Sequence, residues 1–339
     1  MFLGYIHSFR ALAIFFIVAG HSIDIFMWPE DSELERFLKI FFSNGTALFV
    51  FIAGYLFQHL SNKYNIWKYY GAKFRYVLVP YFLISIPAIL IFVTIMERDS
   101  VWEGFYESPV WLQVFYFYLT GAHLTPFWFI PMIVIFYIFA PLLVKADQSK
   151  YFYYAIPPLL LLSCFIDRGM PHQSFVHFFS LYLLGMFCSH YKNEINTLLK
   201  QTFPQLILVS LLFFLVYFEF YFMKGTMTYV NFLQKCIMSL FFLGLLIRFV
   251  EKPQTKLIDT IADCSFGIFF VHSYIISGSR IVFESINGSL ITGDIIGYII
   301  AIITLFFAVY QWKENQSFEK NIVSLENKVD SLNTKHDYL

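Results

Sequence analysis

The chain has 339 residues, of which 58% are hydrophobic, 22% aromatic and only 14% charged. A soluble domain is about half apolar and about a quarter charged, so this composition excludes an ordinary soluble protein. The 23 basic and 23 acidic residues leave no net charge, and we therefore expect no nucleic-acid partner.

Apolar runs of membrane-spanning length recur along almost the whole chain. Most are about 16–24 residues long, which is enough, or nearly enough, to cross about 30 Å of hydrocarbon. The sequence therefore predicts an all-α polytopic integral membrane protein with about ten transmembrane helices. A shorter apolar segment, 107–120, is interpreted as an interfacial or re-entrant part of a long loop. The ten helices are expected at residues 9–28, 38–58, 74–96, 126–145, 151–167, 174–190, 204–223, 229–250, 258–282 and 291–312.

Lys and Arg residues concentrate in alternate loops and in the C-terminal tail. Basic loops stay on the cytoplasmic side, so this distribution predicts that both termini are cytoplasmic. We expect a multi-pass protein of the inner (plasma) membrane, with a transmembrane domain at 1–312. Residues 313–339 are expected to form a short cytoplasmic tail, either an amphipathic helix or a disordered segment.

Arg10 and His21 stand at two points of the first apolar helix, 9–28. A rise of about 1.5 Å per residue separates them by about 16 Å, and about 100° per residue returns them to nearly the same face. A cation and an imidazole on one face of a membrane helix are costly unless they line a polar cavity. The spacing suits a long, thin, anionic ligand. The run has no small-residue cleavage site, so we expect a retained helix rather than a signal peptide.

His21 is the strongest candidate for chemistry, because histidine titrates near neutral pH without large tuning. We interpret it as a general base, with Asp24 as a carboxylate that fixes its tautomer and raises its basicity. Each of these two roles has an alternative. Instead of a base, His21 is a structural histidine bonded to a polar neighbour. Instead of an orienting group, Asp24 is a charge at the membrane boundary, in water.

Arg10, Lys73 and Arg75 lie at the predicted cytoplasmic ends of the first and third helices. Cations that converge at the mouth of one cavity suit phosphate groups. The alternative is that they anchor the helices by reaching toward lipid headgroups, as we expect for Lys63 and Lys68.

The cysteines predict neither a metal site nor a redox centre. All four lie inside apolar segments and none forms a CxxC pair, so we interpret them as buried packing thiols. We expect no bound metal. The residues concerned are Cys164, Cys188, Cys236 and Cys264.

Several motifs together resemble one known family. Arg10 and His21 in the first helix are followed by the sequences at 48–57, 73–81, 126–131 and 265–272, the last ending at His272. Their order and spacing are similar to those of the membrane acyltransferase-3 family, across about residues 5–312. Within 126–131, Trp128 corresponds to the family's aromatic element.

This resemblance implies O-acetyl transfer from acetyl-CoA to a hydroxyl of a cell-surface glycan or lipid-linked sugar. The expected partners are acyl-CoA, a glycan or glycolipid acceptor and the lipid bilayer, while an oligomer is neither required nor excluded. The implied catalytic residues are His21 and Asp24. The expected donor-binding and substrate-binding residues are, respectively, Arg10, Lys73 and Arg75, and His272 and Trp128.

A transporter or flippase for a lipid-linked glycan is the main alternative. Such a protein would also place polar residues at the membrane midplane and line a cavity with aromatic side chains. It would transfer no acyl group, and the common face of Arg10 and His21 would have no special role.

Overall fold

The computed structural model describes residues 3–223, 228–249, 255–287, 291–311 and 313–314. These parts of the chain form helices and connecting turns, and their only β-type pairing is an isolated bridge between Met27 and Thr292. The all-α class predicted from the sequence is therefore confirmed. The predicted tail lies outside the described residues, apart from Lys313 and Glu314.

Four helices form the centre of the molecule: α1 (Gly4–Ser22), α3 (Thr46–His59), α9 (Pro171–His190) and α12 (Tyr229–Phe249). Two glycines allow α3 and α9 to approach closely. A Cβ on Gly54 would lie 2.0 Å from the carbonyl oxygen of Tyr182, and one on Gly185 would lie 2.1 Å from that of Phe51. Small residues at such a contact are typical of helix packing in membranes.

Seven helical segments within the described residues have the length and composition to cross a membrane. The segment predicted at 151–167 includes the short helix α8 (Ile156–Phe165), and that at 291–312 is the helix Ile295–Gln311. The structure thus supports a multi-pass membrane protein, while the number of ten spans and the side of the termini stay predictions. The seven segments are Gly4–Ile25, Glu33–His59, Ile66–Thr94, Thr125–Ala146, Thr202–Phe222, Tyr229–Phe249 and Lys256–Ile286.

The segment predicted as one continuous helix at 38–58 is divided in two. Helix α2 (Glu33–Phe42) ends before Asn44, whose φ of 61° lies in the left-handed region, and α3 begins at Thr46. Asparagine tolerates this conformation better than most residues. The sequence carries a local signal for this break, because Ser43, Asn44 and Gly45 interrupt the apolar run and Asn-Gly is a common turn pair.

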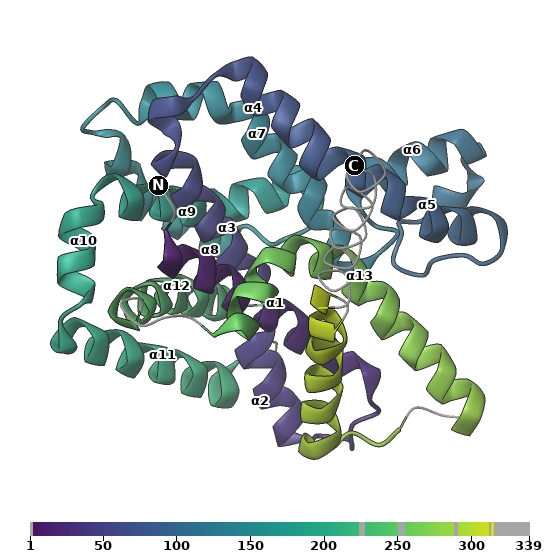
Figure 1. The fold of residues 1–339 in the computed structure, drawn as a ribbon. Helices are drawn as coiled ribbons and strands as arrows, with labels where there is room; N and C mark the ends of the chain where they lie inside the picture. The colour runs from purple at the N-terminus through teal and green to yellow at the C-terminus, as the bar shows by residue number, and fades with distance from the viewer. Residues whose placement is uncertain (1–2, 224–227, 250–254, 288–290, 312, 315–339) are drawn as a thin grey trace, which may run out of the picture.

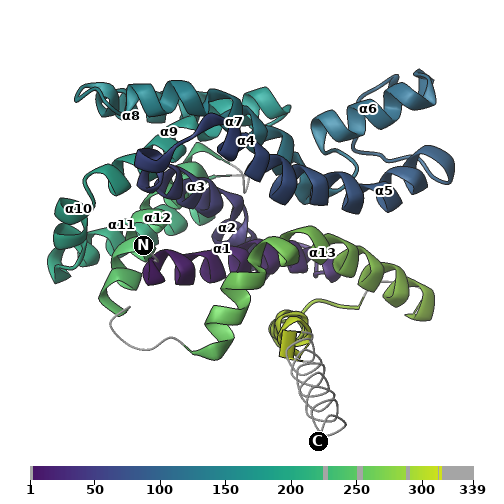
Figure 2. The ribbon, with the colours of Figure 1, turned by 45° about the horizontal axis from the view of Figure 1, so that its top comes forward.

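The third predicted helix begins earlier than expected and is irregular. Helix α4 (Ile66–Lys73) continues through a π-helical turn at Phe74–Leu78 into α5 (Val79–Thr94). The segment 107–120 contains a short helix, α6 (Val110–Thr120), that packs on α5. Together α5 and α6 form an arm that extends from the centre (Figures 1 and 2), with a small core of Ile89, Phe105 and Phe117.

The remaining helices surround this centre. Helices α7 (Phe129–Ala146) and α8 pack against α9, and α10 (Lys192–Leu199) leads to α11 (Thr202–Phe222), which pairs with α12. Helix α13 (Lys256–Asn287) lies along α1 and bends as it continues outward (Figure 2). The contact between α1 and α13 brings the first and ninth predicted helices together.

Candidate active site

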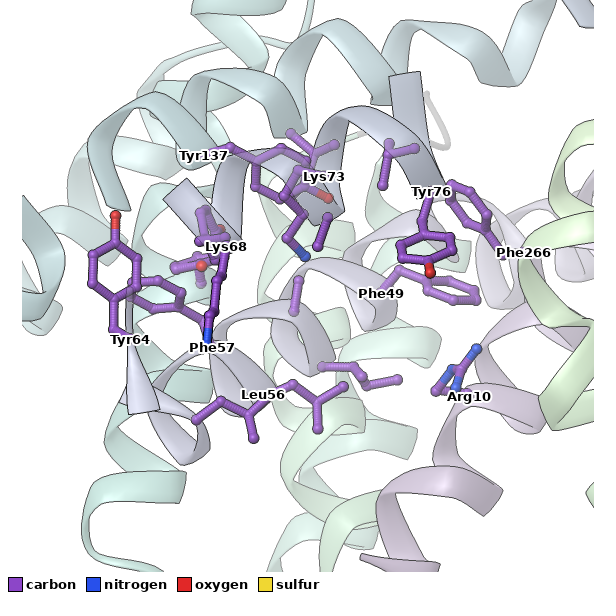
Figure 3. Close-up of a pocket in the computed structure, with 18 of the residues that line it drawn as sticks. Arg10, Phe49, Leu56, Phe57, Tyr64, Lys68, Lys73, Tyr76, Tyr137 and Phe266 are labelled. Carbon is purple, nitrogen blue, oxygen red and sulfur yellow. The ribbon is translucent and has the colours of Figure 1, made fainter. Parts of the chain in front are cut away.

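A cavity of about 680 Å³ lies between α3 and α4 and reaches α1, α7, α9 and α13. Its wall carries four cations: Arg10, Lys63, Lys68 and Lys73. Figure 3 shows Arg10 on one side of this space, with Lys68 and Lys73 across from it. Because cations from three chain segments line one space, the cavity suits a ligand with several negative charges. Tyrosines also line it, namely Tyr64, Tyr69, Tyr76, Tyr137 and Tyr182.

Arg10 is held in place by a residue of another helix. Its Nη2 donates to Oγ of the fully buried Ser265 on α13 at 3.0 Å. Lys73 is held by aromatic rings, with its Nζ 4.6 Å from the ring centre of Tyr137 and 5.3 Å from that of Tyr69. Cation–π contacts of this length fix a side chain without neutralising its charge.

The other predicted phosphate ligand, Arg75, does not line the cavity. It is exposed, and its guanidinium lies 5.6 Å from the ring of Tyr76. Lys63 and Lys68, which the sequence suggested were membrane anchors, do line the cavity. The position of Arg75 has a simple cause. Residues two apart in a helix lie about 200° apart around its axis, so Arg75 points away from the cavity that Lys73 lines.

His21 and His272 lie close together outside the cavity, further along α1 than Arg10 and further along α13 than Phe266. Their ring centroids lie 5.4 Å apart, although they belong to α1 and α13. Nδ1 of His272 lies 3.0 Å from the carbonyl oxygen of Ile268, to which it must donate its hydrogen. The neutral ring then has Nε2 as an acceptor. This Nε2 is buried and has no hydrogen-bond partner among the described residues, so it can receive one from a ligand.

Asp24 lies close to this pair but is not joined to it. It is exposed, in the short 3-10 turn Ile23–Ile25 that follows α1. Its charge acts on the His21 ring, yet the structure contains no hydrogen bond between the two described side chains. The orienting role of Asp24 stays a prediction.

Phe269 separates the cavity from the histidine pair. Its ring lies 5.5 Å from that of Phe129 and 6.3 Å from that of Phe266, both of which line the cavity. On its other side, it lies 6.0 Å from the ring of His272. Arg10, the cavity, Phe269 and the two histidines therefore follow one another along the contact between α1 and α13.

Trp128 precedes Phe129 of the cavity wall, and its contacts bring in a residue that sequence reasoning missed. Its ring stacks on Phe178 at 5.9 Å, and the guanidinium of Arg168 lies 5.3 Å from its centre. Arg168 donates from Nη1 to Oδ1 of Asn44 at 3.0 Å. In the sequence, Arg168 is only one of several outer-loop cations, and no periodic pattern places it near His21.

A second group of buried polar residues lies between α2, α11 and α12. Lys235 is fully buried and donates to the carbonyl oxygen of Phe41, and Asn231 donates to that of Ile40 at 3.0 Å. Asn231 also donates to Glu219 at 3.3 Å. Because these groups satisfy carbonyls in the last turn of α2, they hold the end of that helix.

The comparisons with known proteins bear on what this arrangement does. Within the described residues, no three His, Cys, Asp or Glu side chains are grouped closely enough to hold a metal ion. No curated protein and no solved structure gave a significant match. A family model described as an acyltransferase domain matches residues 3–310, which confirms the resemblance seen in the motifs. The chain therefore belongs to this acyltransferase family and is a multi-pass membrane acyltransferase.

Proposed function

We propose that the protein transfers an acetyl group from acetyl-CoA to a hydroxyl of a cell-surface glycan or lipid-linked sugar. The reaction takes place at the inner (plasma) membrane. One observation carries the proposal: the cationic cavity and the histidine pair lie at successive positions along the contact between α1 and α13. This arrangement suits a donor with phosphates at one end and a reactive thioester at the other.

The cavity accounts for recognition of the donor. Arg10 and Lys73 bind its phosphates, and Lys63 and Lys68 add positive charge to the same wall. The tyrosine rings provide flat surfaces for the adenine base. The pantetheine arm extends from Arg10 toward His21, about 16 Å away along α1, and displaces Phe269 from between the cavity and the histidines.

His21 acts as the general base. It takes the proton from the acceptor hydroxyl as the hydroxyl oxygen attacks the thioester carbon. The tetrahedral intermediate then collapses, the carbon–sulfur bond breaks, and the CoA thiolate takes the proton from His21. His272 accepts a hydrogen bond through its unpartnered Nε2 and orients the acceptor beside His21. Trp128 forms an apolar wall on the acceptor side.

Membership of an acyltransferase family favours this chemistry over the transport alternative. A lipid-linked glycan transporter needs no cationic cavity that continues toward a pair of histidines. Transport without acylation stays a distinguishable outcome of the experiment below.

The test compares membranes from cells that contain the protein with membranes from cells that lack it. Both are incubated with acetyl-CoA labelled in the acetyl group, and the host glycan is analysed by mass spectrometry before and after mild alkali. We expect an alkali-labile acetyl ester on the glycan only when the protein is present. Glycan that crosses the membrane without gaining a label would contradict the proposal and support transport.

A further inference from the structure

Arg168 is fixed in the short connection between α8 and α9 by partners from two other segments. Its guanidinium lies 5.3 Å from the ring centre of Trp128, which in turn stacks on Phe178. Its Nη1 donates to Oδ1 of Asn44 at 3.0 Å. A planar guanidinium held over a ring and by an amide has a defined orientation, because both contacts restrict its plane.

The backbone brings the segment that holds this guanidinium close to the helix that carries His21. A Cβ on Gly20 would lie 3.1 Å from the carbonyl oxygen of Phe42 and 3.7 Å from the backbone nitrogen of Ser43. Gly20 precedes His21, and Ser43 precedes Asn44, so the close approach of α1 to the end of α2 brings the backbone of the base near that of Asn44, which holds Arg168. The charge of Arg168 also acts on the His21 ring.

Arg168 keeps its charge in this position. Burial lowers the pKa of its guanidinium to about 10, which still leaves it protonated at neutral pH. A guanidinium has five N–H donors, and Asn44 accepts from one of them.

We propose that Arg168 is a further catalytic residue, whose guanidinium stabilises the oxyanion that forms when an acceptor hydroxyl attacks the thioester. This inference rests on the proposed function. In the attack, the acceptor O–H bond breaks and its proton passes to His21, while a new carbon–oxygen bond forms. The carbonyl π electrons move onto the oxygen, which becomes the anion that Arg168 binds. When the carbon–sulfur bond breaks, the carbonyl re-forms and the contact weakens.

A preorganised donor of this kind accelerates the chemical step without tightening binding of the ground state. Its effect therefore appears in kcat. A cation that bound a negative charge on the acceptor sugar would instead change KM for the acceptor. The two roles of one guanidinium can be separated by steady-state kinetics.

The experiment measures transfer of labelled acetyl from acetyl-CoA to host glycan, together with binding of desulfo-CoA, which cannot be acylated. Arg168→Met should lower the saturated rate about 10²–10³-fold and leave desulfo-CoA binding unchanged. Guanidinium ions added to Arg168→Ala should restore part of its rate. Arg98→Met is the matched control. Arg98 also makes a cation–π contact, 5.1 Å from the ring of Phe92, and donates to Ala122, but in the α5–α6 arm.

Asn44→Gly provides a second variant that keeps the cation. Glycine accepts the positive φ of this position, so the change removes the amide without straining the backbone. We expect a smaller fall in kcat than for Arg168→Met, with KM for acetyl-CoA unchanged. An unchanged kcat in Arg168→Met, or an effect confined to KM for the acceptor, would overturn the inference.

His21→Ala in the same assay distinguishes a failure of the role of Arg168 from a failure of the proposed function. If His21→Ala is inactive while Arg168→Met keeps its full rate, the role of Arg168 is wrong and the proposed reaction stands. If wild-type membranes transfer no acetyl group, the proposed function itself fails.

Discussion

The imidazoles of His21 and His272 face each other from two helices that are far apart in the sequence. Their centroids lie 5.4 Å apart at an interplanar angle of 41°. His21 is partly exposed at the end of α1, whereas His272 is fully buried within α13. One histidine is therefore accessible to an acceptor, and the other presents a fixed, buried acceptor nitrogen beside it. The two are suited to different tasks.

Replacing His272 should lower the rate without removing it. Loss of one neutral hydrogen bond costs about 0.5–1.5 kcal/mol, so His272→Ala should reduce glycan acetylation about 2–10-fold. His123→Phe is the matched control. His123 is also fully buried, with Nδ1 bonded to a backbone carbonyl and Nε2 without a partner, but it lies next to Tyr81 in the arm. Equal rates for wild type and His272→Ala would remove His272 from the site.

Removing single cations from the cavity should weaken donor binding more than it slows turnover. For Arg10→Ala and Lys73→Ala, the loss of a charge-assisted contact should cost about 1.5–3 kcal/mol and raise KM for acetyl-CoA about 10–150-fold. Lys68→Ala should act in the same direction. Arg75→Ala is the comparison, since Arg75 lies outside the cavity wall and should change KM less. The same KM in all four variants would show that these cations serve only as anchors.

Lys235 and Glu219 should stabilise the protein through their separate hydrogen bonds near the end of α2. Lys235→Met removes the charged donor to the carbonyl oxygen of Phe41, which should cost about 1.5–3 kcal/mol of unfolding free energy. Glu219→Gln keeps an oxygen that can accept from Asn231 and should cost less. Thermal unfolding in detergent measures both.

A matched surface pair provides the control for these variants. Lys39 and Glu35 form a partly exposed ion pair at 2.6 Å within α2, and Lys39→Met should cost only about 0.3–0.5 kcal/mol. If Lys235→Met is no less stable than Lys39→Met, the buried group does not hold α2 in the way described.

His123 should make the stability of the protein depend on pH. Burial lowers the pKa of this ring to about 4, below its usual value of 6.5. Between these values the unfolded chain binds more protons than the folded one, so stability rises with pH. The contribution is complete above about pH 6.5 and falls by up to roughly 3 kcal/mol as the pH decreases to about 4. His123→Phe should remove this part of the pH dependence in thermal unfolding. An identical pH profile in the variant would contradict the assignment.

Parts of the site were predictable because a single helix carries them. Arg10 and His21 share one face of α1, and the helical repeat alone indicates their spacing. The contact of His21 with His272 depends on how α1 packs against α13, which no local pattern encodes. The roles of Arg168 and Asn44 could not be predicted from the sequence for a related reason. Each lies in a connection, where the chain direction depends on a backbone turn such as the positive φ of Asn44 rather than on periodicity.

The fold, like the site, was predictable from the sequence only in part. Apolar runs predicted the helical class and the position of most long helices. They did not predict the break between α2 and α3, although Ser43, Asn44 and Gly45 interrupt the apolar run there. They also did not predict the π-helical turn before α5. Arg75 lies away from the cavity because it follows Lys73 by two residues, and residues two apart point to nearly opposite sides of a helix.

The most direct test of the account is glycan acetylation by His21 variants, measured with labelled acetyl-CoA in membranes with matched amounts of protein. Loss of a positioned base costs roughly 10²–10⁴-fold, so His21→Ala should show almost no transfer while still binding desulfo-CoA. His21→Gln keeps a hydrogen-bonding side chain but cannot take a proton at neutral pH, and it should be equally inactive. Substantial acetylation by His21→Gln would contradict the account, because it would show that His21 is structural and that another group is the base.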